Sequence, residues 1–265
     1  MPRVRRVIRP IRCARHVKSS LRLVVRELIG KPGVGRYNMR ASGLAVHLRQ
    51  PHVDVWMLDE IFQLGGYAIP PAVARALSEL DRPVRILDLG SCVGLATLFF
   101  LEIFPDALIT GFEPDPANRE VLLQTIDENE MGERWTVVGA GASNRDGSAP
   151  FISDHFLSHV DRDSSGDASI TVPTLDVFSY LANADLVKMD IQGGEWDILE
   201  DPRFAATAAT AIVVEYHPYL SPSSDAHRAA QNLLHAAGYT TAPVGNEHDG
   251  EGTIWGWRPG RPTSG

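Results

Sequence analysis

The amino-acid sequence predicts an α/β protein built on a doubly wound parallel sheet of about seven strands, preceded by an N-terminal strand-helix cap. Two observations lead to this interpretation. From residue 81 onward, apolar runs of strand length alternate with segments of helical periodicity, as in parallel strands joined by helices. The 265 residues are 44% hydrophobic and 22% charged, so one domain with a sizeable core is expected.

The first 35 residues form a basic N-terminal extension. Residues 1–31 hold ten Lys or Arg against one acid, Glu27, a net +9; because the whole chain carries −8, the remainder carries −17. Apolar side chains form an approximate helical stripe opposite the arginines, which favours either a helix on a membrane surface or one packed on the domain. No apolar run suits a signal peptide or a membrane span.

Composition also limits the partners and the location. The acidic remainder of the chain argues against a nucleic-acid-binding face. Cys13 and Cys92 offer neither a disulfide framework nor a CxxC metal pair. We therefore expect a cytoplasmic protein, with peripheral membrane contact through residues 1–31 as one alternative, while the oligomeric state stays open.

The N-terminal cap is expected over residues 36–80. Residues 42–49 alternate like a short strand, and residues 54–66 have helical spacing with Asp54 as N-cap. A second helix, over residues 70–80, begins with helix-compatible prolines. These elements would cover one end of the following sheet.

The main domain is expected over residues 81–258. Its strands are predicted at 84–90, 107–114, 134–141, 185–191 and 210–217, with a closing pair at 239–245 and 253–259. Its helices are predicted at 95–104, 116–130, 193–200 and 221–239. Residues 141–173 are rich in turn residues and predict an irregular excursion, and residues 259–265 predict a disordered tail.

The turn after the first main strand, "ILDLGSCVG", indicates a ligand. It reads D-x-G-x-x-x-G over Asp88, Gly90 and Gly94, so it lacks the second glycine of the G-x-G-x-x-G dinucleotide turn. A carboxylate beside the first glycine repels a pyrophosphate and suits the cationic ligand S-adenosylmethionine. The alternative is a tight strand-to-helix turn that binds nothing.

Glu113 favours the cofactor site over a plain turn. It ends the second main strand, 25 residues after Asp88, where a carboxylate is placed to accept hydrogen bonds from two ribose hydroxyls. Carboxyl ends of neighbouring parallel strands meet at one edge of an open sheet, so the turn and Glu113 should face the same ligand.

Several motifs together resemble the FkbM-type methyltransferases, S-adenosylmethionine-dependent enzymes that mostly O-methylate natural products and glycans. The motifs are "ILDLGSCVG", "GFEPDPANREVL", "GASNRDGSAPF", "VPTLDVF", "DLVKMDIQGGEWDIL" and "VVEYHPY", between about residues 42 and 257. Two departures are visible, because the family commonly has Ala-Asn at Ser91 and Cys92 and an acid at Gln192. The resemblance implies a Rossmann-like class I methyltransferase sheet over residues 81–258.

The resemblance also implies which residues hold the cofactor. Asp88, Gly90, Ser91 and Gly94 would surround the methionine part, Glu113 the ribose, Gly141, Ala142 and Ser143 the adenine edge, and Asp190 the transferred methyl group. The alternative role for Asp190 is to cap the helix that follows it.

The catalytic hypothesis is an acid/base pair of Asp190 and His217, which both follow predicted strands toward the ligand edge. Glu215, His155 and His159 are further candidates for the base. No His, Asp or Glu spacing demands a metal, although a divalent ion near Asp190 is compatible with the residues, so no metal is predicted.

The function expected from these residues is O-methylation of a hydroxyl on a natural product, sugar or glycan. The acceptor pocket would be built by residues 1–80 and 143–173, whose pattern does not identify the small molecule or glycan. Two other classes stay open at this point: a nicotinamide-dependent oxidoreductase and a non-catalytic binding protein on the same fold.

Overall fold

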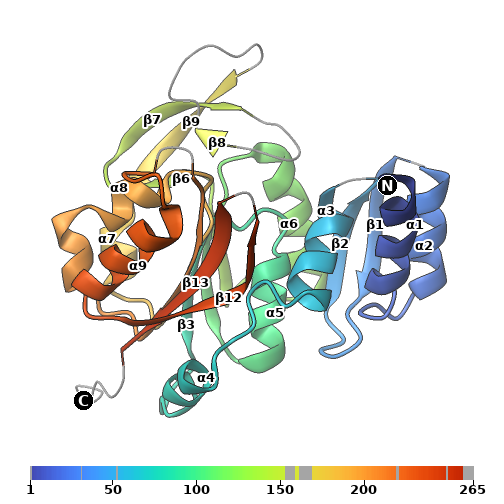
Figure 1. The fold of residues 1–265 in the computed structure, drawn as a ribbon. Coiled ribbons are helices and arrows are strands. Elements are labelled where there is room, and N and C mark those ends of the chain that lie inside the picture. Colours follow the sequence, from blue (N-terminus) through green and yellow to red (C-terminus); the bar gives the residue numbers. More distant parts are fainter. Residues whose placement is uncertain are drawn as a thin grey trace.

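A seven-stranded sheet forms the centre of the protein (Figure 1). The structure is a computed structural model that describes residues 2–30, 32–51, 53–152, 159–160, 169–218, 221–248 and 250–258. The strands are β3 (Arg85–Leu89), β4 (Leu108–Phe112), β5 (Trp135–Val138), β10 (Leu186–Met189), β11 (Ala211–Tyr216), β12 (Thr240–His248) and β13 (Glu251–Trp257). Their order is β12-β13-β11-β10-β3-β4-β5, which confirms all seven predicted strands.

The sheet is mixed rather than wholly parallel. β5, β4, β3, β10 and β11 run parallel, whereas β13 pairs antiparallel with both β11 and β12. The last two strands are joined by a short turn, and a short turn can only join antiparallel neighbours. The five parallel strands therefore present their carboxyl ends along one edge, as expected.

Helices cover both faces of this sheet and create two cores. On one face lie α5 (Leu95–Ile103) and α6 (Pro116–Glu128); on the other lie α7 (Phe178–Leu181), α8 (Glu195–Leu199) and α9 (Ala226–Ala236) (Figure 1). Side chains alternate along each strand, so Ile86 of β3 packs in the first core and Leu87 in the second. The short helix α7 and a 3₁₀ turn at Pro202–Ala206 were not predicted.

Local capping explains where two of the helices begin. The Asp115 carboxylate accepts a hydrogen bond from the Ala117 backbone N–H at 2.8 Å at the start of α6. Asp225 accepts one from the Arg228 N–H, also at 2.8 Å, at the start of α9. These side chains satisfy backbone donors that have no partner within the helix.

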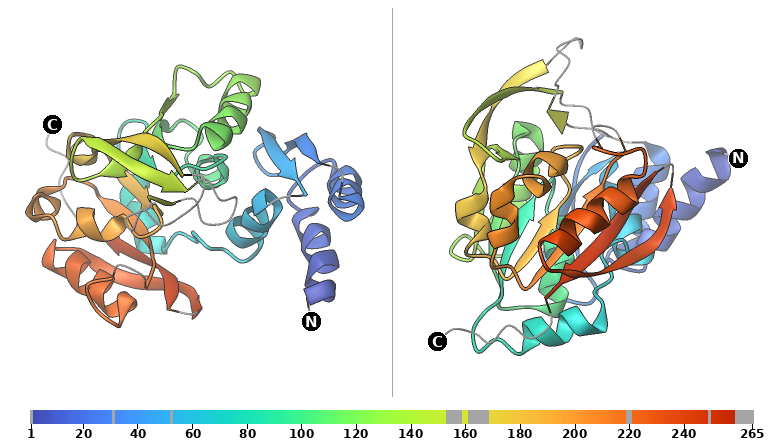
Figure 2. Two further views of the ribbon diagram at one scale, coloured as in Figure 1. Left: turned by 90° about the horizontal axis from the view of Figure 1, so that it is seen from above. Right: turned by 60° about the vertical axis from the view of Figure 1, so that its left-hand side comes forward.

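A second, four-stranded sheet replaces the irregular excursion that we expected over residues 141–173. It consists of β6 (Gly141–Ser143), β7 (Gly147–Ile152), β8 (His159–Val160) and β9 (Ser169–Asp176), in the order β6-β9-β7-β8. Figures 1 and 2 show it standing beyond one end of the central sheet. The turn residues in this segment separate short strands, and this is why the pattern looked irregular.

The N-terminal part contains more structure than predicted. It comprises α1 (Pro2–Cys13), α2 (Ser20–Ile29), β1 (Gly33–Asn38), β2 (Ala45–Gln50), α3 (Val53–Leu58), a π-helical turn (Asp59–Gln63) and α4 (Pro71–Ser78). β1 pairs antiparallel with β2. β1 was not predicted, because it contains Gly33 and Gly35 and glycine is uncommon in strands. The predicted helix over 54–66 is confirmed in its first part and then widens into the π turn.

This N-terminal part shares the first core with the central sheet. Cys13, Val17 and Leu23 are buried in the same cluster as Trp255 of β13. The Asn129 side chain beyond α6 donates to the Ala45 carbonyl at 2.9 Å and accepts from the Ala45 N–H at 2.8 Å. The helices α1 and α2 thus pack their inner side on the domain, and none of the described helices is both long and apolar enough to cross a membrane.

Candidate active site

A cavity of about 740 Å³ opens at the carboxyl ends of β3, β4, β10 and β11. Its wall also includes α3, the segment up to Tyr67, and residues 141–151 of the small sheet. The predicted site residues on this wall are Gly90, Glu113, Gly141, Ala142, Ser143, Asp190 and His217. A volume of this size is typical of small-molecule sites.

Asp88, Ser91 and Gly94 lie behind the wall rather than on it. Asp88 is fully buried, where its carboxylate accepts from the Thr97 hydroxyl at 2.6 Å. The Ser91 hydroxyl donates to the Asp88 carbonyl at 3.0 Å. The structure thus places these three residues behind the wall, where they support the turn, and their direct contact with a cofactor stays a prediction.

Close packing explains the two glycines of the turn. Gly90 has φ +85°, and a Cβ atom there would lie 1.9 Å from the Asp190 carbonyl oxygen of the neighbouring strand end. Gly94 has φ +86°, and its Cβ would lie 2.6 Å from the Leu122 side chain. The spacing thus reflects contact within the protein at both positions.

Glu113 joins the turn after β3 to the start of α6. Its Oε2 accepts from the Cys92 N–H at 2.7 Å, and its Oε1 accepts from the Asp115 N–H at 2.8 Å and the Asn118 amide at 3.3 Å. Burial raises the pKa of Glu113 to about 7, although these three donors act in the opposite direction. A carboxylate offers about four lone-pair sites, so roughly one is left for a further donor from the cavity.

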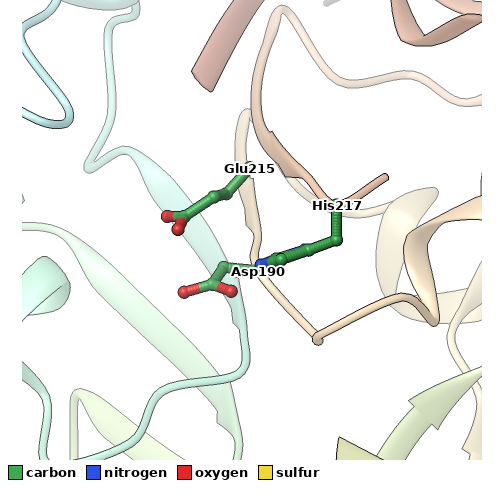
Figure 3. A group of neighbouring side chains, drawn as sticks. All are labelled: Asp190, Glu215 and His217. Carbon is green, nitrogen blue, oxygen red and sulfur yellow. The ribbon is translucent and has the colours of Figure 1, made fainter. Parts of the chain in front are cut away.

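Asp190, Glu215 and His217 converge on one space in the cavity (Figure 3). One polar atom from each side chain lies within 4.8 Å of those of the other two. Asp190 follows β10 directly, Glu215 lies in β11, and His217 follows β11. The structure therefore brings the predicted acid/base pair together, along with Glu215, a further candidate for the base.

The buried Glu195 fixes the orientation of His217. Its Oε1 lies 2.8 Å from the His217 Nδ1 and accepts from the His217 backbone N–H at 3.0 Å, while its Oε2 accepts from the Gly193 N–H at 2.8 Å. Burial alone would lower the pKa of His217, but Glu195, Asp190 and Glu215 raise it to about 9.

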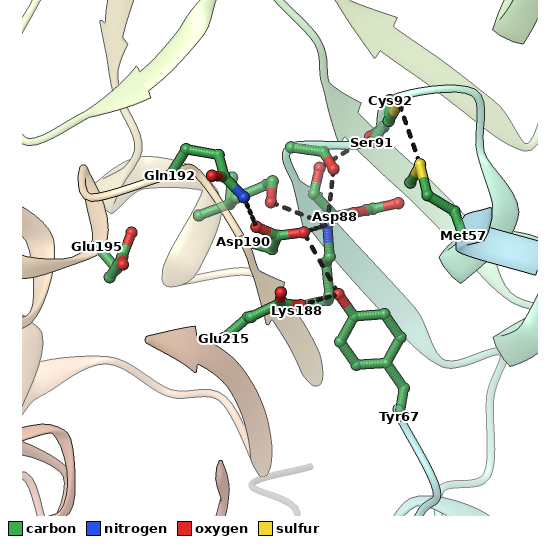
Figure 4. A network of polar contacts seen from close by, with 12 residues as sticks. Met57, Tyr67, Asp88, Ser91, Cys92, Lys188, Asp190, Gln192, Glu195 and Glu215 are labelled. Carbon is green, nitrogen blue, oxygen red and sulfur yellow. Dashed lines mark hydrogen bonds and ion pairs between the residues drawn. The ribbon is translucent and has the colours of Figure 1, made fainter. Parts of the chain in front are cut away.

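Lys188 and Tyr67 support the acidic side chains (Figure 4). The buried Lys188 Nζ lies 3.4 Å from Asp88 Oδ1 and 3.6 Å from Asp190 Oδ2, and donates to the Gly90 carbonyl at 2.6 Å. The Tyr67 hydroxyl donates to Glu215 Oε2 at 2.9 Å. Burial opposes the positive charge of Lys188, but the neighbouring carboxylates raise its pKa above the ordinary value.

Sequence reasoning missed the role of Glu195, and it left Lys188 open between solvent and a carboxylate partner. The signal for Lys188 was available, because a lysine within the apolar run "DLVKM" of a central strand needs a buried partner. Glu195 carried no such signal, since an acid at the first turn of a helix is commonly exposed. His155 and the side chain of His159, which were also candidates for the base, lie outside the described residues.

The two departures from the family pattern occupy unusual backbone positions. Cys92 has φ +48° and Gln192 has φ +53°, both in the left-handed region. The Cys92 Sγ lies 3.8 Å from the Met57 Sδ, and burial raises the pKa of its thiol well above the ordinary value. The Gln192 amide donates to Asp190 Oδ1 at 3.1 Å, a role that a carboxylate at 192 would not fill.

The family profile of the methyltransferase FkbM domain matches residues 88–241, more than half of the chain. The fold is that of an S-adenosylmethionine-dependent methyltransferase with a Rossmann-like sheet. The chain belongs to the FkbM methyltransferase family, which confirms the resemblance based on its motifs. Because this family consists of methyltransferases, the nicotinamide-dependent oxidoreductase alternative is rejected.

Several solved structures are distantly similar to the chain. An S-adenosylmethionine-dependent methyltransferase from Agrobacterium tumefaciens has a TM-score of 0.47 and 12% identity, over 86% of this chain and 70% of that one. The precorrin-6y C5,15-methyltransferase of Geobacter metallireducens has 0.41 and 14%, over 71% and 86%. The TYW2 protein of M. jannaschii, solved with AdoMet, has 0.41 and 11%, over 86% of each chain. A search of the curated proteins found no match.

The residues on the cavity wall fit S-adenosylmethionine. Glu113, only 4% exposed, is a buried acceptor suited to a ribose hydroxyl, and the Asn118 amide lies beside it. Gly90 and Asp190, at the ends of β3 and β10, also lie on the wall. The turn that contains Gly90 lacks the G-x-G-x-x-G pattern of dinucleotide-binding turns. We expect Glu113, Gly90, Asp190 and residues 141–143 to hold the cofactor.

Proposed function

We propose that the protein methylates a hydroxyl oxygen on a natural product, sugar or glycan. The observation that supports this proposal is the convergence of Asp190, Glu215 and His217 on the cavity wall, within 4.8 Å of one another. A hydroxyl acceptor needs a group that removes its proton during transfer, and this cluster supplies candidates for that group. Residues 53–67 and 143–151, which line the same cavity, are the segments expected to contact the acceptor.

In this proposal Asp190 and His217 act as a pair. S-adenosylmethionine supplies an activated methyl group when bound. Asp190 accepts the proton of the acceptor hydroxyl as the new oxygen–carbon bond forms, and His217 lies beside it in the same group of polar side chains. Positioned proton removal contributes about 10²- to 10⁴-fold to a rate. Glu195 acts indirectly, because it holds His217 through Nδ1.

The test uses S-adenosylmethionine carrying a ¹³C-methyl group, incubated with the protein and an extract of small molecules and glycans. NMR of the products should show the label on oxygen, and Asp190→Asn should reduce its incorporation about 100-fold. Gly132→Ala is the matched control, because the added carbon has open space around it and the variant should incorporate as much label as the wild type.

Label on nitrogen or carbon would overturn the O-methyl proposal. S-adenosylhomocysteine binding with no labelled product in any extract would instead favour a non-catalytic binding protein. A comparison of metabolites from a deletion strain, in which the accumulating precursor lacks one methyl group, would then identify the acceptor.

We also propose a peripheral contact between α2 and an anionic membrane surface. Leu21 and Ile29 are 76% and 72% exposed, and Val25 and Leu28 are exposed beside them. Exposed basic residues of the same segment, including Arg22, complement a negatively charged lipid surface. The inner side of the segment is occupied by the domain core, so only this outer side is available.

A further inference from the structure

The group formed by Asp190, Glu215 and His217 has a second chemical capacity beyond proton transfer. Two carboxylates and one imidazole, from the ends of two adjacent strands, present three ligand atoms that lie within 4.8 Å of one another (Figure 3). Three such ligands, with water or substrate completing the shell, are a common arrangement for a catalytic divalent ion. We propose that these three residues bind a divalent metal ion of the Mn²⁺ type.

The support behind His217 is independent evidence for this site. Glu195 is fully buried and engages His217 Nδ1, so the other ring nitrogen is directed to the side of Asp190 (Figure 3). A carboxylate behind one imidazole nitrogen, with a ligand in front of the other, is the usual outer-shell pattern of metal-bound histidine. Glu195 also accepts two backbone N–H groups, so its position is fixed before any ion binds.

The two carboxylate ligands are likewise held from behind. The Tyr67 hydroxyl donates to Glu215 Oε2 at 2.9 Å, and the Gln192 amide donates to Asp190 Oδ1 at 3.1 Å. Asp190 Oδ2 also lies 3.4 Å from the Tyr67 hydroxyl and 3.6 Å from Lys188 Nζ, so both oxygens of Asp190 are oriented by the protein. A carboxylate oxygen has two lone pairs, so each carboxylate keeps capacity for a further ligand. All three ligands are thus oriented by neighbours of known position.

The charge of the cluster favours a cation. Glu60, Asp190 and Glu215 line the same cavity, so three carboxyl groups face one space. The Lys188 ammonium group contacts Asp190 of this group, but it also pairs with Asp88. A bound dication, with His217 neutral, would balance Asp190 and Glu215 without calling on Lys188.

The mixed ligand set indicates the class of metal. Carboxylate oxygens suit Mg²⁺, Ca²⁺ and Mn²⁺, whereas an imidazole nitrogen favours transition metals over the first two. Mn²⁺ accepts both kinds of ligand. On the proposed function, on which this role rests, such an ion would hold the acceptor oxygen beside Asp190 and lower the pKa of its hydroxyl.

Binding is tested directly with Mn²⁺ and the full chain, in the presence and absence of S-adenosylhomocysteine. The EPR signal of free aqueous Mn²⁺ should fall until one ion is bound per chain. Glu215→Gln, Asp190→Asn and His217→Gln should each weaken this binding at least about tenfold, as expected for loss of one ligand. Glu251→Gln, which changes a carboxylate on the same wall outside the group, should leave it unchanged.

Two results would overturn the proposal: no stoichiometric Mn²⁺ binding to the wild-type chain, or equal binding by the three ligand variants. S-adenosylhomocysteine affinity and circular dichroism show whether each variant is folded, so a misfolded variant is not counted as a lost ligand. Label transfer to oxygen that persists in EDTA would reject the metal and retain the proposed function. Mn²⁺ binding together with label on nitrogen would retain the metal site and reject the proposed O-methylation.

Discussion

Glu113 carries the strongest residue-scale expectation, because it is buried, lines the cavity and still has capacity for about one more donor. Replacing it by alanine would also remove its bonds to Cys92 and Asp115 and disturb the turn. Glu113→Gln keeps the shape and removes the charge. We expect this variant to bind S-adenosylhomocysteine about 1.5 to 3 kcal/mol more weakly by titration calorimetry. Unchanged affinity would reject Glu113 as a cofactor ligand.

The raised pKa of Glu113 also predicts a pH dependence. Burial raises its pKa to about 7, so the carboxyl group is mostly protonated at pH 6 and mostly ionised at pH 8. Because the ionised form is the better acceptor, affinity for S-adenosylhomocysteine should rise about tenfold between these two pH values. The Glu113→Gln variant should lack this rise, and a rise that persists there would point to another group.

The buried Lys188 is expected to contribute to the stability of the folded protein through its ion pairs. Its ammonium group pairs with Asp88 and Asp190 and lies in the protein interior. Lys188→Met should lower the free energy of unfolding in urea by about 3 to 5 kcal/mol, because it leaves Asp88 charged and unpaired. Adding Asp88→Asn should recover part of that loss. Additive losses in the double variant would mean that the two residues are not coupled.

At the scale of elements, the turn between β3 and α5 depends on close contact with the end of β10. Gly90→Ala would force a Cβ atom against the Asp190 carbonyl, in addition to the cost of its positive φ. Gly238→Ala is the matched control, since Gly238 has φ +83° and no neighbour within 4 Å. The control should lose about 1 to 2 kcal/mol in urea unfolding, and Gly90→Ala distinctly more. Equal losses would exclude the contact as a cause.

Sequence patterns predicted some elements far better than others, for physical reasons. The strands β3, β10 and β11 at the middle of the sheet are apolar and continuous because both faces of the sheet are covered there, so their signal was strong. The strands that were not predicted are short and contain glycine or turn residues, as in β1, "GVGRYN", and in the small sheet. Such strands show no clear alternation of apolar and polar residues, so the sequence did not indicate their pairing.

Sequence also identified the site better than its supporting contacts. Glu113, Asp190 and His217 were predicted from strand ends, a rule that depends only on topology. The bonds of Glu195 to His217 and of Tyr67 to Glu215 join residues 22 and 148 positions apart. Such pairings depend on packing between elements, which one sequence does not display.

At the scale of the whole molecule, the outer side of α2 predicts membrane binding that depends on salt. The full chain should sediment with vesicles containing anionic lipid at low ionic strength and less so as salt screens the basic residues. Leu21→Ser should weaken this binding about tenfold, because a largely exposed leucine would otherwise enter the lipid. Leu123→Ser, at an exposed leucine of α6, is the control. Equal sedimentation of both variants would exclude α2 as the contact.

The division of the cavity wall between two sheets has an evolutionary consequence. Asp190, Glu215 and His217 lie at the ends of β10 and β11, whereas another part of the wall comes from β7 and β9 of the small sheet. On the proposed function, mutations or recombination within residues 147–176 would change acceptor preference while these chemical groups stay in place. A graft of residues 147–176 from a relative should transfer preference for that relative's acceptor and leave S-adenosylhomocysteine affinity intact.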